Sequence, residues 1–138
     1  MITTKKSIPT ALVLAAGALA SAIAFGADVN VKLSGANEVP PVTASGGGQG
    51  KFTIADDGAV SGSVTTTGVA GTAAHIHQAA AGKNGPVIIP LTKEGDTYTV
   101  PAGAKLNAEQ IQAFKAGDLY VNVHTAANKG GEVRAQLK

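Results

Sequence analysis

The sequence contains no cysteine and no tryptophan, and its single methionine is Met1. The lack of cysteine excludes disulfides, thiolate metal sites, cysteine nucleophiles and redox pairs. The lack of an internal methionine also excludes a thioether copper site. Aromatic residues make up only 4% of the chain, which leaves little surface on which nucleic-acid bases could stack. Any stable domain formed by this chain must therefore rest on an apolar core without covalent cross-links.

Charged residues are also few, at 14% of the chain, and their balance gives a formal net charge of +2. Two of the lysines, Lys5 and Lys6, lie in the N-terminal segment. From Phe25 onward the chain has nine Lys or Arg and nine Asp or Glu, so the net charge of this part is zero. There is no basic cluster, and we expect no nucleic-acid partner.

The N-terminal segment has the pattern of a cleaved secretory signal. Lys5 and Lys6 supply a positive start, residues 11–25 are apolar and alanine-rich, and Ala22-Ile23-Ala24 offers small residues for a signal peptidase. The alternative, an uncleaved anchor, fits less well because the apolar run is short and weakly hydrophobic for a span of about 20 residues. We therefore expect residues 1–27 to be a signal peptide, residues 28–138 to form one domain, and the protein to be periplasmic or secreted.

The remaining part of the chain predicts an all-β domain with one short helix. Apolar and polar residues alternate in several short segments separated by turn residues, which is typical of an antiparallel sandwich or barrel. One segment differs: Asn107 is a plausible helix N-cap with Gln110 three residues on, as in a capping box, and Gly117 is a normal helix stop. The pattern predicts a β-sandwich with a single helix over about residues 107–117.

The last two predicted strands alternate in the same way. In residues 119–124 and 132–137 the odd positions are apolar, so we expect them to face the core. The even positions are then predicted to face outward, and they include Tyr120, Asn122, His124, Glu132, Arg134 and Gln136.

The three histidines of the chain are the most informative residues for function. His75 and His77 flank Ile76 in a predicted strand, so they share one face, roughly 6.6 Å apart along the chain. His124 lies on the polar face of another predicted strand. Two imidazoles at this spacing can lean onto one metal ion at about 2.0–2.1 Å. This placement argues against three histidines buried in the core.

Three motifs, in order, resemble those of the chordin-type (CHRD) domain and cover essentially all of the chain after the signal. They are Leu33-Ser34-Gly35-Ala36-Asn37-Glu38-Val39-Pro40-Pro41-Val42; Ala73-Ala74-His75-Ile76-His77 with Asn84-Gly85-Pro86-Val87; and Leu119 to Thr125 with Gly130-Gly131-Glu132-Val133-Arg134-Ala135-Gln136-Leu137. The resemblance implies an immunoglobulin-like sandwich, and bacterial members are typically small secreted or periplasmic proteins without an established activity. Gln78 and Ala135 depart from the glycine that many members carry.

Three functions follow as hypotheses, of which metal binding is the first. We expect His75, His77 and His124 to bind one metal ion, with copper favoured and zinc or nickel as alternatives, in a handling rather than a catalytic role. Ligand histidines usually donate their second N–H to a carboxylate or carbonyl, for which Glu38, Asn122 and Glu132 are candidates.

The second hypothesis is an extracellular structural or protein-interaction module without a metal, acting through loops such as residues 38–41 toward an envelope or extracellular protein. A remote third is redox activity like that of copper–zinc superoxide dismutase, to which His75, His77, His124 and Arg134 give a weaker similarity. The chain has too few histidines for that two-metal site. No nucleophile-base-acid set, phosphate-binding loop or dinucleotide fingerprint is present, so we expect no enzyme of those classes.

Overall fold

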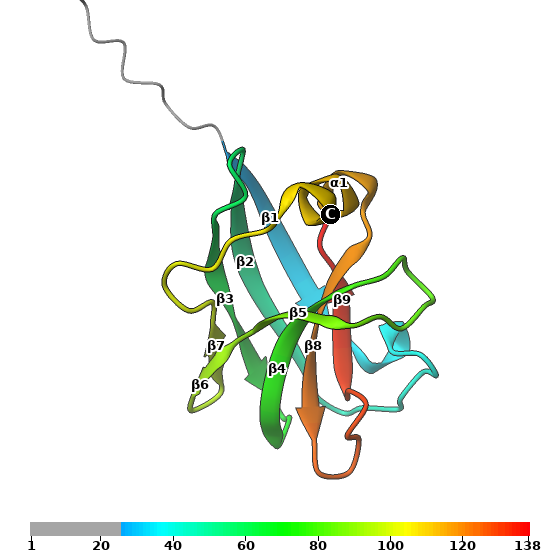
Figure 1. Ribbon diagram of the computed structural model, residues 1–138. Helices are drawn as coiled ribbons and strands as arrows, with labels where there is room; N and C mark the ends of the chain where they lie inside the picture. Colours follow the sequence, from blue (N-terminus) through cyan, green and yellow to red (C-terminus); the bar gives the residue numbers. More distant parts are fainter. Residues whose placement is uncertain (1–25) are drawn as a thin grey trace, which may run out of the picture.

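A computed structural model describes residues 26–138 of the chain (Figure 1). The expected signal peptide lies outside these residues, apart from Gly26 and Ala27, which already belong to the first strand. In chain order the elements are β1 (Gly26–Leu33), the short 3-10 helix η1 (Gly35–Asn37), β2 (Gly47–Ala55), β3 (Val60–Thr67), β4 (Gly71–Gln78), β5 (Val87–Pro90), β6 (Thr92–Glu94), β7 (Thr97–Thr99), α1 (Ala108–Ala116), β8 (Leu119–Thr125) and β9 (Val133–Gln136).

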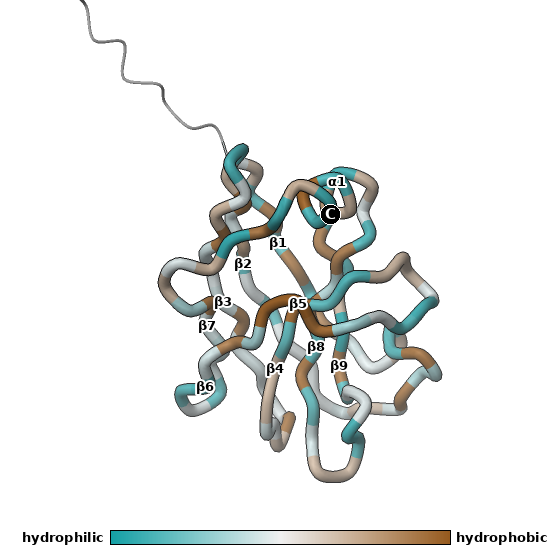
Figure 2. Tube along the Cα trace, viewed as in Figure 1, coloured by the Kyte–Doolittle hydropathy of each residue, from teal (hydrophilic) through white to brown (hydrophobic). Residues whose placement is uncertain are grey.

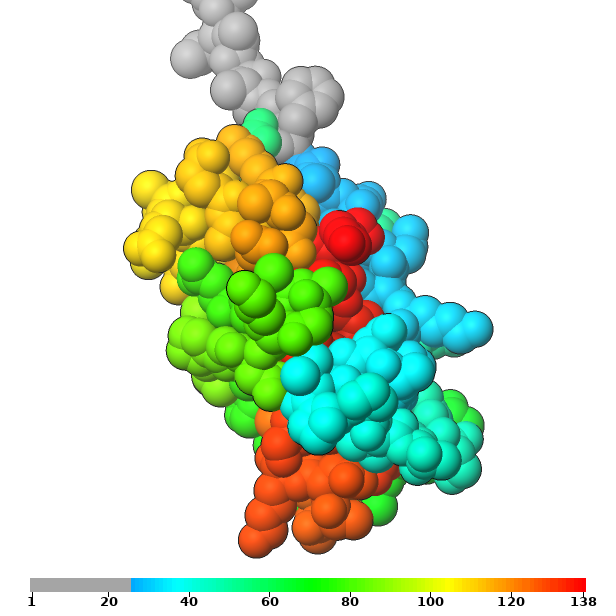
Figure 3. Space-filling view, turned by 90° about the vertical axis from the view of Figure 1, so that its right-hand side faces the viewer, coloured from blue at the N-terminus to red at the C-terminus, as the bar shows by residue number. Residues whose placement is uncertain are grey.

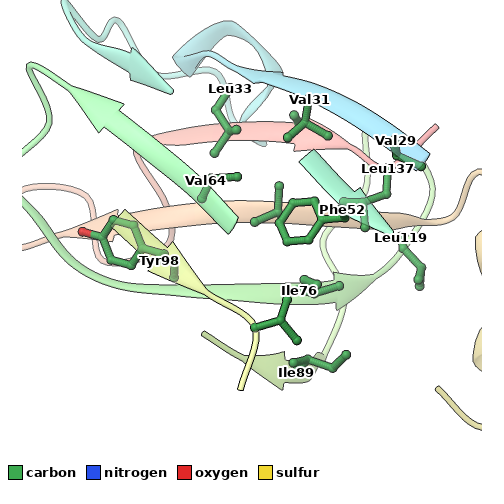
Figure 4. Packing of buried hydrophobic residues seen from close by; sticks show 14 of the residues in the cluster. Val29, Val31, Leu33, Phe52, Val64, Ile76, Ile89, Tyr98, Leu119 and Leu137 are labelled. Carbon is green, nitrogen blue, oxygen red and sulfur yellow. The ribbon is translucent and has the colours of Figure 1, made fainter. Parts of the chain in front are cut away.

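The strands form two antiparallel sheets that pack face to face, as the sequence predicted. One sheet has the order β1-β2-β3-β7-β6 and the other has the order β5-β4-β8-β9. The space between them is filled by apolar side chains from both sheets (Figure 4). Phe52 and Val64 have no exposed surface, and burying a side chain of this size stabilises the fold by roughly 1.5–3 kcal/mol. The sandwich therefore rests on one apolar core.

Both sides of the sandwich are partly closed by the chain. On one side, Ser34 and Arg134 form an isolated bridge between the end of β1 and β9. On the other, the chain leaves β5, donates a hydrogen bond from the Leu91 N–H to the Ala74 carbonyl, and continues as β6 in the opposite sheet. β5 is an apolar segment beside β4, visible as a brown band in Figure 2. These links cover edges that would otherwise be open for pairing.

The single α-helix begins and ends at the residues that the sequence predicted. The Asn107 side chain accepts a hydrogen bond from the Gln110 N–H, and the Gln110 side chain accepts one from the Asn107 N–H, which completes a capping box. Gly117 takes the left-handed conformation at the C-cap. Ile111 and Phe114 pack against the core from one end of the sandwich. No helix formed by residues 26–138 combines the length and apolarity that crossing a membrane requires.

The outer face of the β4-β8-β9 region differs from the prediction. Odd residues of β8 and β9, such as Val121, Val123 and Val133, lie in the core as expected. Tyr120, Asn122 and Arg134 point away from the core, as predicted, but they are only 1–2% exposed. Other segments of the chain cover them on this outer face.

Two loops provide this second cover. Asn84 in the segment between β4 and β5 donates a hydrogen bond to the Val39 carbonyl in the segment after η1, which ties the two loops together. The same neighbourhood is visible in Figure 3, where the cyan segment after η1 and the green segment after β4 lie side by side. The two loops therefore cover one end of the strand face that carries the histidines and leave the other end open.

Candidate metal centre

Strand pairing brings the three histidines together. β4 and β8 are antiparallel neighbours, with Ala73 opposite His124 and His75 opposite Asn122. His124 is thus the diagonal neighbour of His75 on the same face, within reach of a long side chain. His77 lies two residues further along β4. Alternation along the strand predicted the shared face of His75 and His77, and the register of β4 against β8 adds His124.

The imidazole nitrogens converge on one small volume. His75 Nδ1 lies 2.9 Å from His124 Nε2. The ring centroids of His75 and His77 are 5.7 Å apart, and those of His77 and His124 are 5.9 Å apart. One nitrogen from each ring lies within 4.8 Å of the others, a spacing that can hold a metal ion. Among residues 26–138 this is the one such group of His, Asp and Glu side chains.

Backbone carbonyls orient two of the rings. His77 Nδ1 donates to the Gly85 carbonyl at 2.9 Å, and His124 Nδ1 donates to the Lys129 carbonyl at 2.8 Å. Each of these bonds assigns the proton to Nδ1 and leaves the Nε2 lone pair directed toward the cluster. His75 Nδ1 then donates to His124 Nε2. The carbonyl bonds of His77 and His124 match the arrangement usual for ligand histidines, whose second nitrogen donates to a carbonyl or carboxylate.

His77 Nε2 has no hydrogen-bond partner although it is buried. The Asn122 side chain lies close enough to raise the pKa of His77 slightly, but it makes no bond of hydrogen-bond geometry to this nitrogen. A buried acceptor without a donor costs roughly 1–3 kcal/mol. A metal ion held by the three histidines would give this lone pair a partner.

Burial holds the pKa of His75 and of His77 below the ordinary imidazole value. Desolvation is the main cause for both rings, and the positive charges that neighbouring histidines acquire on protonation add to it. For His77, the hydrogen bond to Gly85 partly opposes this shift. Both rings therefore stay neutral, which is the ligand form, at lower pH than a free imidazole does.

His77, Tyr120 and Arg134 form a stack of three side chains. The Tyr120 ring stacks on His77 with 4.7 Å between centroids and 5° between planes. The Arg134 guanidinium carbon lies 3.4 Å from the centroid of the same tyrosine ring, in a cation–π contact. Because all three groups are buried, their stacking leaves His77 little freedom to rotate.

Arg134 also fixes the loop that provides the partner of His77. Its guanidinium donates to the Lys83 carbonyl at 2.7 Å, to the Ala80 carbonyl at 3.3 Å and to the Asn84 side chain at 3.2 Å. Several donors on one planar group can hold a loop in a single conformation. Two residues after Lys83, the Gly85 carbonyl accepts from His77. Sequence reasoning missed this role, since an arginine on the polar face of a strand gave no sign of being buried.

Glu38, Asn122 and Glu132 were expected to accept hydrogen bonds from the histidines, but carbonyls take that place for His77 and His124. Glu132 instead accepts from Thr125 and from the Asn128 side chain, both at 3.1 Å, and so shapes the turn that carries the Lys129 carbonyl. Asn122 donates to the Gly130 carbonyl at 3.2 Å. These residues form the surroundings of the site rather than direct contacts to its rings.

Glu38 lies in the buried polar layer beside Asn122. Its side chain is 4% exposed, and its Oε1 atom has no hydrogen-bond partner. Burial raises the pKa of Glu38 to about 7, although the Asn122 side chain and the charge of Arg134 oppose the shift. The Glu38 and Asn122 side chains occupy the space next to Gly131. A Cβ at position 131 would collide with Glu38 Oε1 and Asn122 Nδ2.

Comparison with protein families gives one match. The CHRD domain model covers residues 29–137, which is nearly the whole of the part that the structure describes. No curated protein and no solved structure matches the chain. The match spans both sheets and all three histidines, in agreement with the three motifs. The chain belongs to the CHRD domain family.

Proposed function

We propose that this protein binds one copper ion through His75, His77 and His124, and that it handles the metal in the periplasm or outside the cell without catalysing a reaction. The observation that carries the proposal is the convergence of three imidazoles, with one nitrogen of each within 4.8 Å of the others, together with a buried His77 Nε2 that has no partner. Two of the three rings are held by carbonyl hydrogen bonds at Nδ1, so that Nε2 of each ring carries the lone pair.

The type of donor favours a transition metal. Three imidazoles and no carboxylate suit copper, zinc or nickel, whereas calcium and magnesium prefer oxygen ligands. Among divalent first-row metals, copper binds nitrogen ligands most strongly. Secretion into an oxidising compartment, which the N-terminal segment predicts, favours Cu(II).

The proposal is limited to one metal ion. Among residues 26–138, only the three histidines form a group with metal-binding spacing, so the structure supports no two-metal centre of the superoxide dismutase kind.

Copper titration of single-site variants tests the proposal. His75→Ala and His124→Ala should each abolish stoichiometric copper binding and leave the fold intact, because both rings are only half-buried. Gln78→Ala, on the same strand, is the matched control and should bind like the parent protein. The protein must be untagged, and thermal unfolding reports the fold. Unchanged copper affinity in both histidine variants would contradict the site.

A further inference from the structure

We propose that the bound metal takes a small inorganic anion at its open coordination position, from a cleft that lies beside His75 and His124. This inference rests on the proposed function, since the metal is the main binding group for the anion. The cleft has a volume of about 480 Å³. Besides the two histidines, the side chains that matter for its chemistry are Thr72, Ala73, Val87, Thr125, Ala126 and Lys129.

The cleft is the open side of the metal centre. His77 is buried under the Tyr120 ring and the loop that ends at Gly85, so this side of the site is closed. His75 and His124 line the cleft and are partly exposed. A ligand from solvent can therefore approach the metal on the side of His75 and His124.

The charge of the site calls for an anion. Three neutral imidazoles leave the full charge of a divalent metal uncompensated, and Lys129 is the only charged side chain that lines the cleft. Its backbone carbonyl holds His124, which places the start of this side chain beside the metal ligands. Glu132, which accepts from Thr125 and Asn128, and the buried Glu38 do not line the cleft. An anion in the cleft would thus meet two positively charged groups and no carboxylate among the lining residues.

Three of the residues that line the cleft are apolar. Ala73, Val87 and Ala126 are apolar, and Val87, 49% exposed, is the one exposed large hydrophobic side chain among the residues that the structure describes. Apolar walls lower the local dielectric constant and strengthen the attraction between the metal and the anion.

Both hydroxyl groups in the cleft already donate elsewhere. Thr72 donates to the His124 carbonyl and Thr125 donates to Glu132. A phosphate or sulfate needs several donors, and of the hydroxyl and ammonium groups that line the cleft only Lys129 makes no other hydrogen bond. The cleft therefore suits a small anion that binds the metal through one atom, such as a halide or azide.

Azide titration of the copper-loaded protein tests this inference, with copper content measured before and after. We expect a saturable azide-to-copper charge-transfer band and a change in the EPR spectrum, with one azide per copper. Lys129→Gln keeps the backbone carbonyl that His124 uses and should weaken azide binding about two- to five-fold, as expected for one exposed charge. Lys105→Gln, an exposed lysine before α1, is the control and should change nothing.

A cleft-filling variant locates the anion. Ala73 lies on the same outward face of β4 as His75, so Ala73→Leu places extra carbon atoms in the cleft without entering the core. It should retain one copper and lose at least ten-fold in azide affinity.

The outcomes separate the two proposals. One copper per chain with no spectral response to azide would overturn the anion site and leave the metal site standing. Azide binding that is the same in Lys129→Gln, Ala73→Leu and the parent protein would place the anion outside the cleft and overturn it as well. If the protein retains no copper, both the proposed function and this inference fail.

Discussion

The buried carboxyl of Glu38 should give the metal-free protein a stability that falls as the pH rises. In the folded protein its pKa is raised from 4.5 to about 7, mainly by burial. Between these two values the folded state keeps a proton that the unfolded state has lost. The stabilisation is therefore full below pH 4.5 and is lost as the pH rises through 7.

The size of the effect follows from the pKa shift. One pKa unit corresponds to about 1.4 kcal/mol, so a shift from 4.5 to about 7 corresponds to about 3 kcal/mol. The side chain is only 4% exposed, which leaves little solvent to screen it. Glu38→Gln replaces the carboxyl by a neutral group of the same shape. Relative to the parent protein, this variant should gain about 3 kcal/mol of unfolding free energy between pH 4 and pH 8.

The assay is urea unfolding at fixed ionic strength and with a chelator, at several pH values between 4 and 8. His75 and His77 have lowered pKa values, so their contribution makes stability rise as the pH rises. The reason is that these rings bind protons more weakly in the folded protein than in the unfolded chain. Both proteins share these histidines, so the difference between them isolates Glu38. Glu94→Gln, at an exposed position of β6, is the control. A difference between Glu38→Gln and the parent protein that does not change with pH would refute the reasoning.

Three further predictions follow from the same contacts. Gly131→Ala should lower the unfolding free energy by more than about 2 kcal/mol in urea, because the new Cβ collides with buried polar atoms and Gly131 has a φ of 126°; stability equal to the parent protein would contradict this. Tyr98→Phe should leave stability unchanged or raise it by up to about 1 kcal/mol, since the buried Tyr98 hydroxyl has no partner; a loss of more than 1 kcal/mol would show a partner for that group. As the pH is lowered, copper affinity should stay unchanged to below pH 6.5 and only then fall, because burial lowers the pKa of His75 and His77. Isothermal titration at pH 5 to 8 measures this affinity, and a loss of affinity that begins above pH 7 would contradict the prediction.

Local patterns in the sequence predicted the parts of the fold that depend on neighbouring residues. Asn107 and Gln110 form the expected capping box because both groups lie within one helical turn. His75 and His77 share a face because side chains alternate along any strand. The two-sheet architecture followed from the same alternation, which separates core-facing positions from the rest.

The surroundings of the site depend on contacts between distant parts of the chain, and the sequence did not reveal these. His124 meets His75 only because β8 pairs with β4 in one register. Arg134 and Tyr120 are buried because the loop before β5 folds over the outer face, and Arg134 itself holds that loop through the Lys83 carbonyl. Alternation assigned both side chains to the face away from the core correctly, but it contains no information on whether a loop covers that face.

The most direct test of the account is the metal content of the untagged protein after incubation with equal concentrations of copper, zinc and nickel, followed by desalting. We expect one copper per chain, with little zinc or nickel, and loss of that copper in His75→Ala. A protein that retains no metal, or that retains the same amount of copper in His75→Ala as in the parent, would contradict it.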